Sequence, residues 1–446
     1  MKKTDILIIG GGPAGLIAGV TARKNNPDKK ITLIREDKKC VVPCGLPYIF
    51  NRLEAVEKNM MPDKAYKANK IDLVIDKAVK IETDNKKVIL KSNKKINYDK
   101  LVLAVGSSPA IIPIKGAELK GVYQIKKDIK YLENLRKKII KAKNIVIIGG
   151  GFIGAELAEE LSAMEEKNIS IVEILDHCLI APFDEEFAIA GEEKIKEKGV
   201  NLYLKTAVEE IMGGDKVEAV KLSNGEEISA DLVIMSVGAR PNIELAKNAE
   251  IEVVEKGGIL VDEFMRTNTP DVFAVGDCAE TRDFFTGKSN LIMLASVACY
   301  EARIAGANLY RASENLIKNE GTVAAFSTCL QGLVLASVGL NEKTAVKEDI
   351  EIVIGVSETP NHHPGTLPNT SLIKIKLVFE KSSKILIGGQ VSGPENIAEM
   401  INLIAVAVVK KMTAQELANL QVATHPLITA PPTAYPIITA AQAVLD

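Results

Sequence analysis

One pattern occurs twice in this sequence and restricts the fold more than any other feature. The segments DILIIGGGPAGLIAGV and NIVIIGGGFIGAELAEE each read as an apolar strand, a G-x-G-x-x-G turn and a helix. In such a turn the first glycine permits a tight bend, the second lets the backbone approach a pyrophosphate, and the third lets helix and strand pack closely. The repeat therefore predicts two dinucleotide-binding units in one chain.

The two turns supply matching sets of candidate binding residues. In each copy a second apolar strand follows, over residues 31–34 and 169–172, and an acid comes after it, Glu36 and Glu173. Either glutamate alone could be a solvated charge, but the matching positions favour carboxylates that accept hydrogen bonds from ribose hydroxyls. Because a carboxylate repels a 2'-phosphate, Glu173 favours NADH over NADPH. The turn residues themselves are Gly10, Gly12, Pro13, Ala14 and Gly15 in the first copy, and Gly149, Gly151, Phe152, Ile153 and Gly154 in the second.

Three further apolar runs end on glycine, at Gly106, Gly238 and Gly276. Continuous apolar runs are typical of parallel strands that are buried on both faces. Helical stretches lie between several of the runs, for example over residues 14–24 and 155–165, and this alternation indicates doubly wound α/β layers. The run that ends at Gly276 reads as a late return to the first unit, so we expect the second unit to be inserted between strands of the first.

The pattern changes after about residue 320. Residues 371–379 alternate apolar side chains with Lys374 and Lys376, and residues 385–391 return after a turn, which predicts an antiparallel hairpin with one solvent-exposed face. Two helical stretches follow, and the second starts at Thr413, where Glu416 three residues later completes a capping box.

The predicted fold class is therefore α/β, with two doubly wound Rossmann-like dinucleotide-binding domains and a C-terminal α+β domain. The expected ranges are 1–114 with 245–320 for the first unit, 115–244 for the second, and 321–446 for the third.

Composition excludes several classes of protein. Lys and Arg number 56 against 58 Asp and Glu, a net charge of -2, so the chain has no excess of positive charge for nucleic acid or an anionic membrane. The longest apolar stretch, residues 401–409, is far shorter than the ~20 residues that a membrane helix needs. Six cysteines are too few for a disulfide-stapled scaffold, and none has the C-x2-C spacing of a zinc site. We expect a cytoplasmic protein without a metal.

One cysteine stands out as a candidate catalytic residue. Cys44 lies in CVVPCGLPYIF, soon after Glu36, and Gly45 and Pro47 after it suggest a helix start at which a thiolate would be stabilised. A lone cysteine is usually a small buried apolar residue, and Cys178, Cys299 and Cys329 are interpreted in that way. Cys278 receives no role.

Together these features resemble the FAD-dependent pyridine nucleotide-disulfide oxidoreductases, in the single-cysteine branch that holds coenzyme A disulfide reductase, NADH oxidase and NADH peroxidase. The resemblance covers nearly the whole chain. Its motifs are GGGPAG, PCGLPY, LVLAVGSSP, GGGFIGAE, SVGARPN, TNTPDVFAVGDCAE and LASVACYEARIAGANL.

The resemblance implies a role for residues in each motif. Gly276 and Asp277 would bind the ribityl and phosphate region of FAD, and Leu294 and Ala295 would begin a helix whose dipole faces the flavin. Phe152 and Glu156 would lie near the path of the nicotinamide. Gly106 and Gly238 join the cofactor-binding set through their motifs, and the C-terminal domain would make a homodimer.

Departures from the family bear on the substrate. Peroxidase and water-forming oxidase members carry a histidine in the first glycine turn, where this chain has Pro13. Coenzyme A disulfide reductases carry tyrosines in a Y-Y-P-G segment and near a C-terminal A-P-P segment. This chain reads HHPG at 362–365 and ATHPLITAPP at 423–432, and these histidines could equally belong to exposed loops. Cys40 replaces the usual serine four residues before the redox cysteine, so a Cys40–Cys44 pair is open.

The expected reaction passes electrons from NADH through FAD and Cys44 to a small disulfide or polysulfide, with coenzyme A as a candidate ligand. One alternative is an NADH oxidase that reduces oxygen. An alternative of another class is an electron-transfer reductase for rubredoxin or ferredoxin, and a third is a non-catalytic flavin protein. Nucleic acid and membranes are not expected partners.

Overall fold

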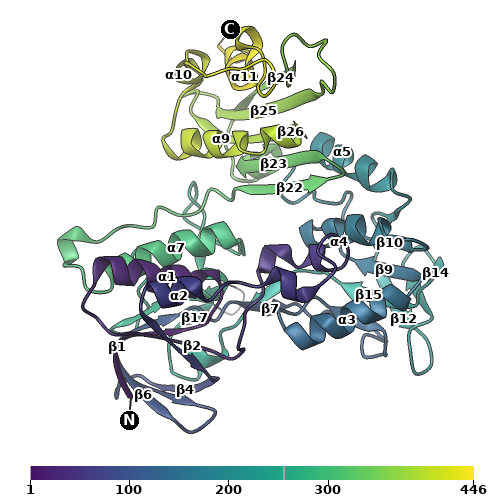
Figure 1. Ribbon diagram of the computed structural model, residues 1–446. Coiled ribbons are helices and arrows are strands. Elements are labelled where there is room, and N and C mark those ends of the chain that lie inside the picture. Colours follow the sequence, from purple (N-terminus) through teal and green to yellow (C-terminus); the bar gives the residue numbers. More distant parts are fainter. Residues whose placement is uncertain (1, 255–256, 446) are drawn as a thin grey trace. The chain divides into compact units, whose positions relative to one another are not determined.

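The computed structural model describes residues 2–254 and 257–445. The chain divides into two compact units, each assembled from three separate segments (Figure 1). Unit 1 consists of Met1–Ile111, Ile125–Lys137 and Gly238–Thr322. Unit 2 consists of Ile112–Gln124, Lys138–Val237 and Val323–Asp446. None of the described helices is long and apolar enough to cross a membrane.

Unit 1 is built on a seven-stranded sheet of order β3-β2-β1-β6-β5-β4, to which β19 adds by pairing with β6. β1, β2, β3, β6 and β19 pair with one another in parallel, and β5 pairs antiparallel with β6 and β4. The pairing of β19 with β6 confirms that the chain returns late to the first unit. The strands are β1 (Lys2–Ile9), β2 (Ile31–Arg35), β3 (Ile71–Ile75), β4 (Ala78–Glu82), β5 (Lys87–Leu90), β6 (Lys95–Leu103), β7 (Ser107–Pro109), β16 (Ala239–Pro241), β17 (Val253–Val254), β18 (Gly258–Ile259), β19 (Val272–Ala274), β20 (Thr281–Arg282) and β21 (Ser289–Asn290).

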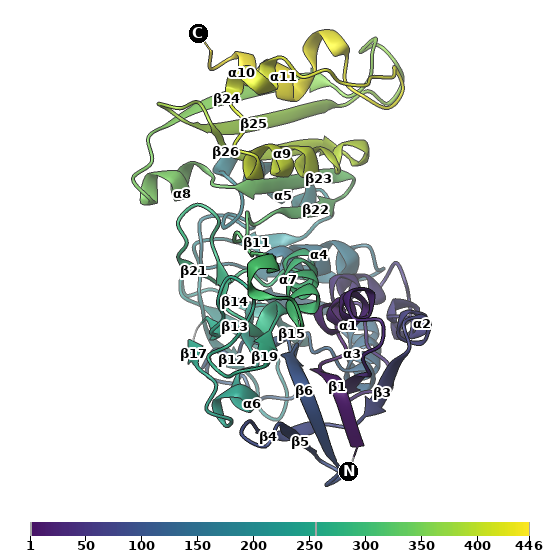
Figure 2. The same cartoon turned by 90° about the vertical axis from the view of Figure 1, so that its left-hand side faces the viewer.

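Two helices of unit 1, α1 (Pro13–Asn25) and α7 (Ala295–Asn308), lie side by side (Figures 1 and 2). Their facing surfaces are made of small residues, and a Cβ at Gly306 would lie 2.7 Å from the carbonyl oxygen of Ala18. The helices therefore approach closely enough to bring the ends of both to one edge of the sheet. The shorter helices are α2 (Lys64–Ala68) and α6 (Glu244–Lys247).

Unit 2 contains two sheets that matter for the site. The first has the order β11-β10-β9-β15-β8 and is entirely parallel, as continuous apolar strands predict. A three-stranded antiparallel sheet, β12-β13-β14, accompanies it. The elements are β8 (Val122–Gln124), β9 (Asn144–Ile148), α4 (Phe152–Ser162), β10 (Asn168–Val172), α5 (Glu185–Lys196), β11 (Asn201–Tyr203), β12 (Val208–Met212), β13 (Ala219–Leu222), β14 (Glu227–Ser229) and β15 (Leu232–Met235). The bounds of the two units divide α3 (Ile129–Lys141), with its residues up to Lys137 in unit 1 and the rest in unit 2.

The second sheet of unit 2 is antiparallel, with the order β22-β23-β26-β25-β24. The expected hairpin is β25–β26, and the capping box at Thr413 and Glu416 is present at the start of α10. α9 packs on β26 and β23, and α11 packs on β24 and β25. The elements are β22 (Phe326–Leu330), β23 (Leu333–Gly339), α8 (Glu342–Lys347), β24 (Ile352–Pro360), β25 (Leu372–Glu380), β26 (Leu386–Pro394), α9 (Met400–Val409), α10 (Ala414–Ala418) and α11 (Pro436–Gln442).

The prediction of a solvent-exposed face on this hairpin was wrong at Lys376, while Lys374 on the same face is 32% exposed. Lys376 on β25 is only 3% exposed, and its ammonium group pairs with Asp184 and Glu186 at the start of α5 and with Glu342 of α8. The acids at the starts of α5 and α8 therefore make a buried ion-pair cluster around Lys376. The α/β fold class with a C-terminal α+β domain is confirmed.

Candidate functional site

The first glycine turn joins β1 to α1 in unit 1. Gly12 is the N-cap of α1 and Pro13 and Ala14 form its first turn, with no side chain capping the free N–H groups. Gly10 has φ +120°, and a Cβ there would lie 2.0 Å from the carbonyl oxygen of Ala104. A Cβ at Gly15 would lie 1.9 Å from the carbonyl oxygen of Gly10, whereas nothing lies within 4 Å of one at Gly12. Gly10 and Gly15 are therefore needed for close packing of the backbone, whereas Gly12, the middle glycine of the motif, borders open space.

The second turn, in unit 2, repeats this division of roles between β9 and α4. Gly149 has φ +102°, and a Cβ at Gly154 would lie 2.0 Å from its carbonyl oxygen. Gly151 is the N-cap of α4 and, like Gly12, has nothing within 4 Å of an added Cβ. The open space at the middle glycine of each turn is the space that a pyrophosphate needs.

The two strand-end acids occupy different environments. Glu173 is buried, and its carboxylate accepts hydrogen bonds from the N–H groups of Gly150 at 2.6 Å and Leu175 at 2.8 Å. Glu36 is exposed and pairs with Lys77 at 3.2 Å. Glu173 therefore also holds the glycine turn in place, which Glu36 does not do. The predicted ribose contact of each acid stays a prediction.

An arginine that the sequence did not single out supports the first turn. Arg35, the last residue of β2, makes two hydrogen bonds to the Asp63 carboxylate and one to the carbonyl of Lys38. The Tyr66 hydroxyl donates to the carbonyl of Gly11 at 3.0 Å. The half-buried Cys40 belongs to the same group, and burial raises the pKa of its thiol. Arg35 and Asp63 are 28 residues apart in the chain, and Tyr66 and Gly11 are 55 apart, so no local sequence motif could predict these contacts.

The Gly276–Asp277 motif meets the first glycine turn within unit 1. Gly276 has φ +72°, and a Cβ there would lie 2.9 Å from the Cβ of Ala14 and 3.2 Å from that of Ala298 on α7. The Asp277 carboxylate accepts a hydrogen bond from the Ser107 hydroxyl at 2.6 Å and lies 3.4 Å from the Lys127 ammonium group. Leu294 is the N-cap of α7 and Ala295 its first residue, so the helix begins where the motif predicted.

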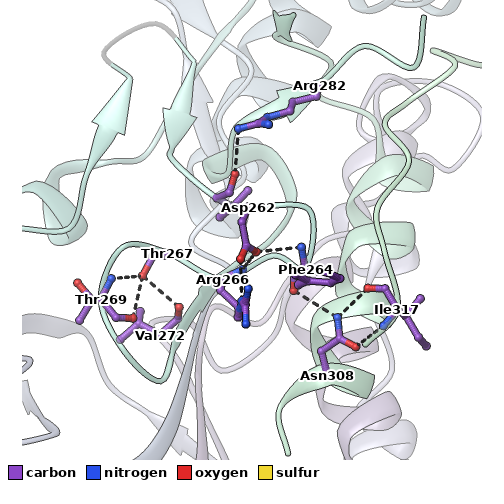
Figure 3. Close-up of polar contacts among 10 residues, drawn as sticks. Asp262, Phe264, Arg266, Thr267, Thr269, Val272, Arg282, Asn308 and Ile317 are labelled. Atoms are coloured by element: carbon purple, nitrogen blue, oxygen red, sulfur yellow. Dashed lines mark hydrogen bonds and ion pairs between the residues drawn. The ribbon is translucent and has the colours of Figure 1, made fainter. Parts of the chain in front are cut away.

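Polar contacts hold the segment that leads into β19 and hence the Gly276–Asp277 motif (Figure 3). The Asp262 carboxylate accepts from the Phe264 N–H and from the Arg266 side chain at 2.7 Å. Asn308, at the end of α7, exchanges two hydrogen bonds with the backbone of Ile317. These hydrogen bonds stabilise the segment before β19 and the end of α7, and none of them involves a residue of the glycine turns.

Gly106 and Gly238 directly precede the two strands of the β7–β16 ladder in unit 1, and because the strands are antiparallel the two glycines lie at opposite ends of it. Both have positive φ, +67° and +93°, and nothing lies within 4 Å of a Cβ at either. The carbonyl of Gly238 accepts from the N–H of Ala110 at 2.9 Å. The carbonyl of Gly106 likewise accepts from the N–H of Asn242 at 2.9 Å, so each glycine lies at one end of the ladder.

The residues that begin α4 face the C-terminal sheet of unit 2. Phe152 stacks on Phe326 with ring centroids 5.5 Å apart, while Ile153 is exposed. Glu156 accepts a hydrogen bond from the Thr328 hydroxyl at 2.9 Å. Burial, with smaller contributions from the nearby Glu159 and Glu160, raises the pKa of Glu156 to about 7 against the opposing effect of the Thr328 hydrogen bond.

Cys44 is exposed and lies at a helix start as expected, although the helix is a single 3-10 turn. It lies inside a short 3-10 turn, Pro43–Gly45, which a second one, Pro47–Ile49, follows at once. Each turn opens on a proline, and two prolines four residues apart cannot share one continuous helix. Burial raises the pKa of the Cys299 thiol on α7, and the nearby Cys44 adds to this shift. All six cysteines lie in the described part of the chain, and none forms a disulfide.

The remaining cysteines and the histidine segments also have defined places. Cys178 is buried beneath Gly150, and Cys278 is buried against the carbonyls of Leu103 and Val275. The two histidine segments lie together in unit 2: the N–H of His363 donates to the carbonyl of Pro426 at 3.1 Å, and its ring contacts the carbonyl of Thr429 at 3.3 Å.

Comparison with known proteins agrees with this arrangement. Residues 4–302 match the family model described as pyridine nucleotide-disulphide oxidoreductase, and residues 326–435 match the dimerisation domain of the same family. A protein named NADH oxidase from Methanocaldococcus jannaschii is 33% identical over 93% of this chain and 93% of its own. An NAD(P)H coenzyme A polysulfide/persulfide reductase from Pyrococcus horikoshii is 34% identical over 89% of this chain and 88% of its own.

A solved structure extends the comparison to the fold. The NAD-dependent persulfide reductase from A. fulgidus superposes with a TM-score of 0.90 at 31% identity, covering 98% of this chain and 82% of that chain. The match spans both glycine turns, the Gly276–Asp277 motif and the C-terminal sheet. The chain therefore belongs to the pyridine nucleotide-disulphide oxidoreductase family.

Proposed function

We propose that this chain is an NADH-dependent FAD flavoprotein that reduces a small disulfide, persulfide or polysulfide through Cys44. The family uses FAD and NADH, and both glycine turns fit a pyrophosphate because their middle glycines border open space. We assign FAD to the turn of unit 1 and NADH to the turn of unit 2. The assignment of the domains follows: 1–114 with 245–320 bind FAD, 115–244 bind NADH, and 321–446 dimerise.

The exposure of Cys44 is the observation that carries the proposal. A sulfur nucleophile must be reachable by its substrate, and Cys44 is exposed while Cys40 is half-buried beside Arg35. Bound FAD supplies the two-electron relay between NADH and sulfur. The Cys44 thiolate attacks one sulfur of the substrate R–S–S–R, forms a mixed disulfide and expels R–S⁻, which takes up a proton. Two electrons and a proton then break the mixed disulfide, and the overall balance is NADH, H⁺ and RSSR giving NAD⁺ and two RSH.

Two relatives named as coenzyme A-dependent or persulfide reductases support this substrate class. A second candidate function is reduction of oxygen, because the similar protein from Methanocaldococcus jannaschii carries the name NADH oxidase. In that reaction Cys44 would be an accessory. Pro13 at the middle of the first turn offers no hydrogen-bond donor that could hold an oxidised sulfur there.

The experiment compares Cys44→Ser with the matched variant Cys40→Ser under anaerobic conditions, with coenzyme A disulfide and with polysulfide as acceptors. We expect Cys44→Ser to keep bound FAD and slow electron leakage to oxygen but to lose disulfide and polysulfide reduction. Cys40→Ser should keep most of that activity. Mass spectrometry of the unreduced protein should find any small-thiol adduct on Cys44.

Two outcomes would replace the proposal. Full turnover of Cys44→Ser with oxygen, and none of the wild type with either sulfur acceptor, would establish the oxidase. Equal loss in both variants, with a Cys40–Cys44 bridge in the oxidised enzyme, would establish a two-cysteine mechanism.

We also propose a homodimer formed through the C-terminal sheet domain. The outer side of α9 carries exposed apolar side chains, with Leu403 at 41%, Val406 at 57% and Val409 at 43% exposure. An apolar stripe of this kind on a helix surface marks an interaction face. The match of residues 326–435 to the family's dimerisation domain supports a second copy of the chain as its partner.

A further inference from the structure

A buried carboxyl group lies beneath the cofactor motif of unit 1. Glu301, in the second turn of α7, is 1% exposed. Its Oε2 accepts a hydrogen bond of 2.8 Å from the N–H of Gly276, the first residue of the Gly276–Asp277 motif. Among the described residues, its Oε1 is buried and has no hydrogen-bond partner. A buried polar atom without a partner is rare and calls for an explanation.

Within the described ranges, three titratable groups interact with Glu301: the Asp277 carboxylate, the Cys278 thiol and the Tyr300 hydroxyl, and burial raises the pKa of the last two so that both stay neutral. Asp277 follows Gly276 directly, and its negative charge acts on Glu301. The buried side of α1, which packs against α7, consists only of Ala14, Gly15, Ala18, Gly19 and Ala22. In the described part of the chain, the N–H of Gly276 is the one hydrogen-bond donor to this carboxyl group and the one group shown to favour its ionised form.

Burial, together with the negative charge of Asp277, therefore raises the pKa of Glu301 to about 8 against the opposing effect of the Gly276 N–H. At neutral pH the group carries its proton. In that form it can accept from Gly276 through one oxygen without placing a second negative charge next to Asp277.

We propose that Glu301 is a positioning residue for FAD: its neutral carboxyl holds the turn that presents Gly276 and Asp277 without adding a charge, whereas the ionised carboxylate would place a negative charge beneath the anionic cofactor and weaken its binding. Bound FAD is anionic, so its phosphates oppose ionisation of Glu301 and the loaded protein keeps the proton to a higher pH than the apoprotein. FAD affinity is therefore highest below about pH 8, where Glu301 is neutral, and falls as the pH rises above that value. This inference concerns the cofactor site alone, so its failure would leave the proposed reaction at Cys44 untouched.

The test measures the dissociation constant of FAD by equilibrium dialysis of the holoprotein between pH 7 and pH 9.5. In the wild type we expect binding about tenfold weaker at pH 9 than at pH 7, because about a tenth of the apoprotein then keeps a neutral Glu301. Glu301→Gln keeps an acceptor for Gly276 and cannot ionise, so its FAD affinity should be the same at both pH values. Glu301→Leu loses the acceptor and should bind FAD more weakly at every pH.

Glu192→Gln provides the matched control, because Glu192 is equally buried but lies in unit 2, where it accepts from the N–H of Cys178 at 2.8 Å. That variant should keep the wild-type pH profile. A Glu301→Gln profile identical to the wild type, or a flat wild-type profile, would overturn the proposal. So would a folded Glu301→Leu protein that binds FAD as tightly as the wild type. If Glu301→Leu does not fold, the comparison of Glu301→Gln with the wild type decides.

Discussion

The ammonium group of Lys376 lies 2.9 Å from the carboxylate of Asp184, and the two side chains are only 4% and 6% exposed. Glu186 pairs with the same ammonium group at 2.8 Å, and Glu342 also contacts it. Burial alone would lower the pKa of Lys376, but hydrogen bonds to Glu186, Glu342 and Asp184 raise it. The lysine thereby holds α5, α8 and β25 together within unit 2.

Replacing Lys376 by Met should destabilise the protein strongly, because three carboxylates then lose their shared cation. Removing one partner of a buried ion pair costs about 3–5 kcal/mol. The free energy of unfolding in urea gives the measurement. Lys374→Met is the control: Lys374 is on the same strand, 32% exposed and 3.9 Å from Glu358, so its loss should change stability by less than about 1 kcal/mol. Equal effects of the two variants would contradict the role of the buried cluster.

Glu156 should make stability depend on pH. Its pKa in the folded protein is about 7, above the ordinary carboxyl value, so its contribution is fully present at low pH and is lost as the pH rises through about 7. Glu156→Gln cannot ionise and should therefore gain stability relative to the wild type between pH 5 and pH 8, on the order of 1–3 kcal/mol. Thermal unfolding across this range provides the measurement. Glu165→Gln, at an exposed position beyond the same helix, should follow the wild-type curve.

Gly12→Val should abolish FAD binding, and the wild-type protein should purify yellow. The added side chain meets nothing in the protein itself, so the variant should fold, but it occupies the space left for the pyrophosphate. Flavin absorbance of the purified proteins measures the loss. Gly214→Val, at an exposed loop glycine with equally open space, should keep its flavin. A colourless wild type that takes up no added FAD would disprove the FAD assignment.

Glu173→Ala should reduce the preference for NADH over NADPH, mainly by raising the Michaelis constant for NADH. The substitution removes the carboxylate expected at the ribose and leaves the N–H groups of Gly150 and Leu175 without their acceptor. Hydrogen bonds to a charged group contribute about 1.5–3 kcal/mol, so thermal stability should fall as well. Steady-state kinetics with both cofactors gives the ratio. A wild type that uses both equally well would count against the assignment.

Val406→Asp on α9 should convert the proposed dimer into a monomer, because it places a charge in the centre of the exposed apolar side of that helix. Light scattering over a wide range of protein concentrations measures the mass. Val79→Asp, at a 46% exposed position on β4 of unit 1, should leave the mass unchanged. A monomeric wild type at all concentrations would refute the dimer.

Local sequence determined the elements that are contiguous in the chain. Each glycine turn carries its whole geometry within six residues, and the capping box at Thr413 and Glu416 spans four, so both could be predicted without knowledge of the fold. The parallel strands were predictable for a similar reason, since burial on both faces leaves a continuous apolar run in the sequence.

Only the tertiary structure decided which polar side chains are buried and what they contact. Ser107 and Lys127 lie 170 and 150 residues from Asp277 in the chain, and Glu301 lies 25 residues from Gly276, so no local pattern links them. Lys376 was expected in solvent because the alternation of apolar and lysine residues shows which side chains share a face of the strand, but not what packs on that face. Asp184 and Glu186 at the start of α5 and Glu342 of α8 lie against Lys376, and their negative charges stabilise the buried ammonium group.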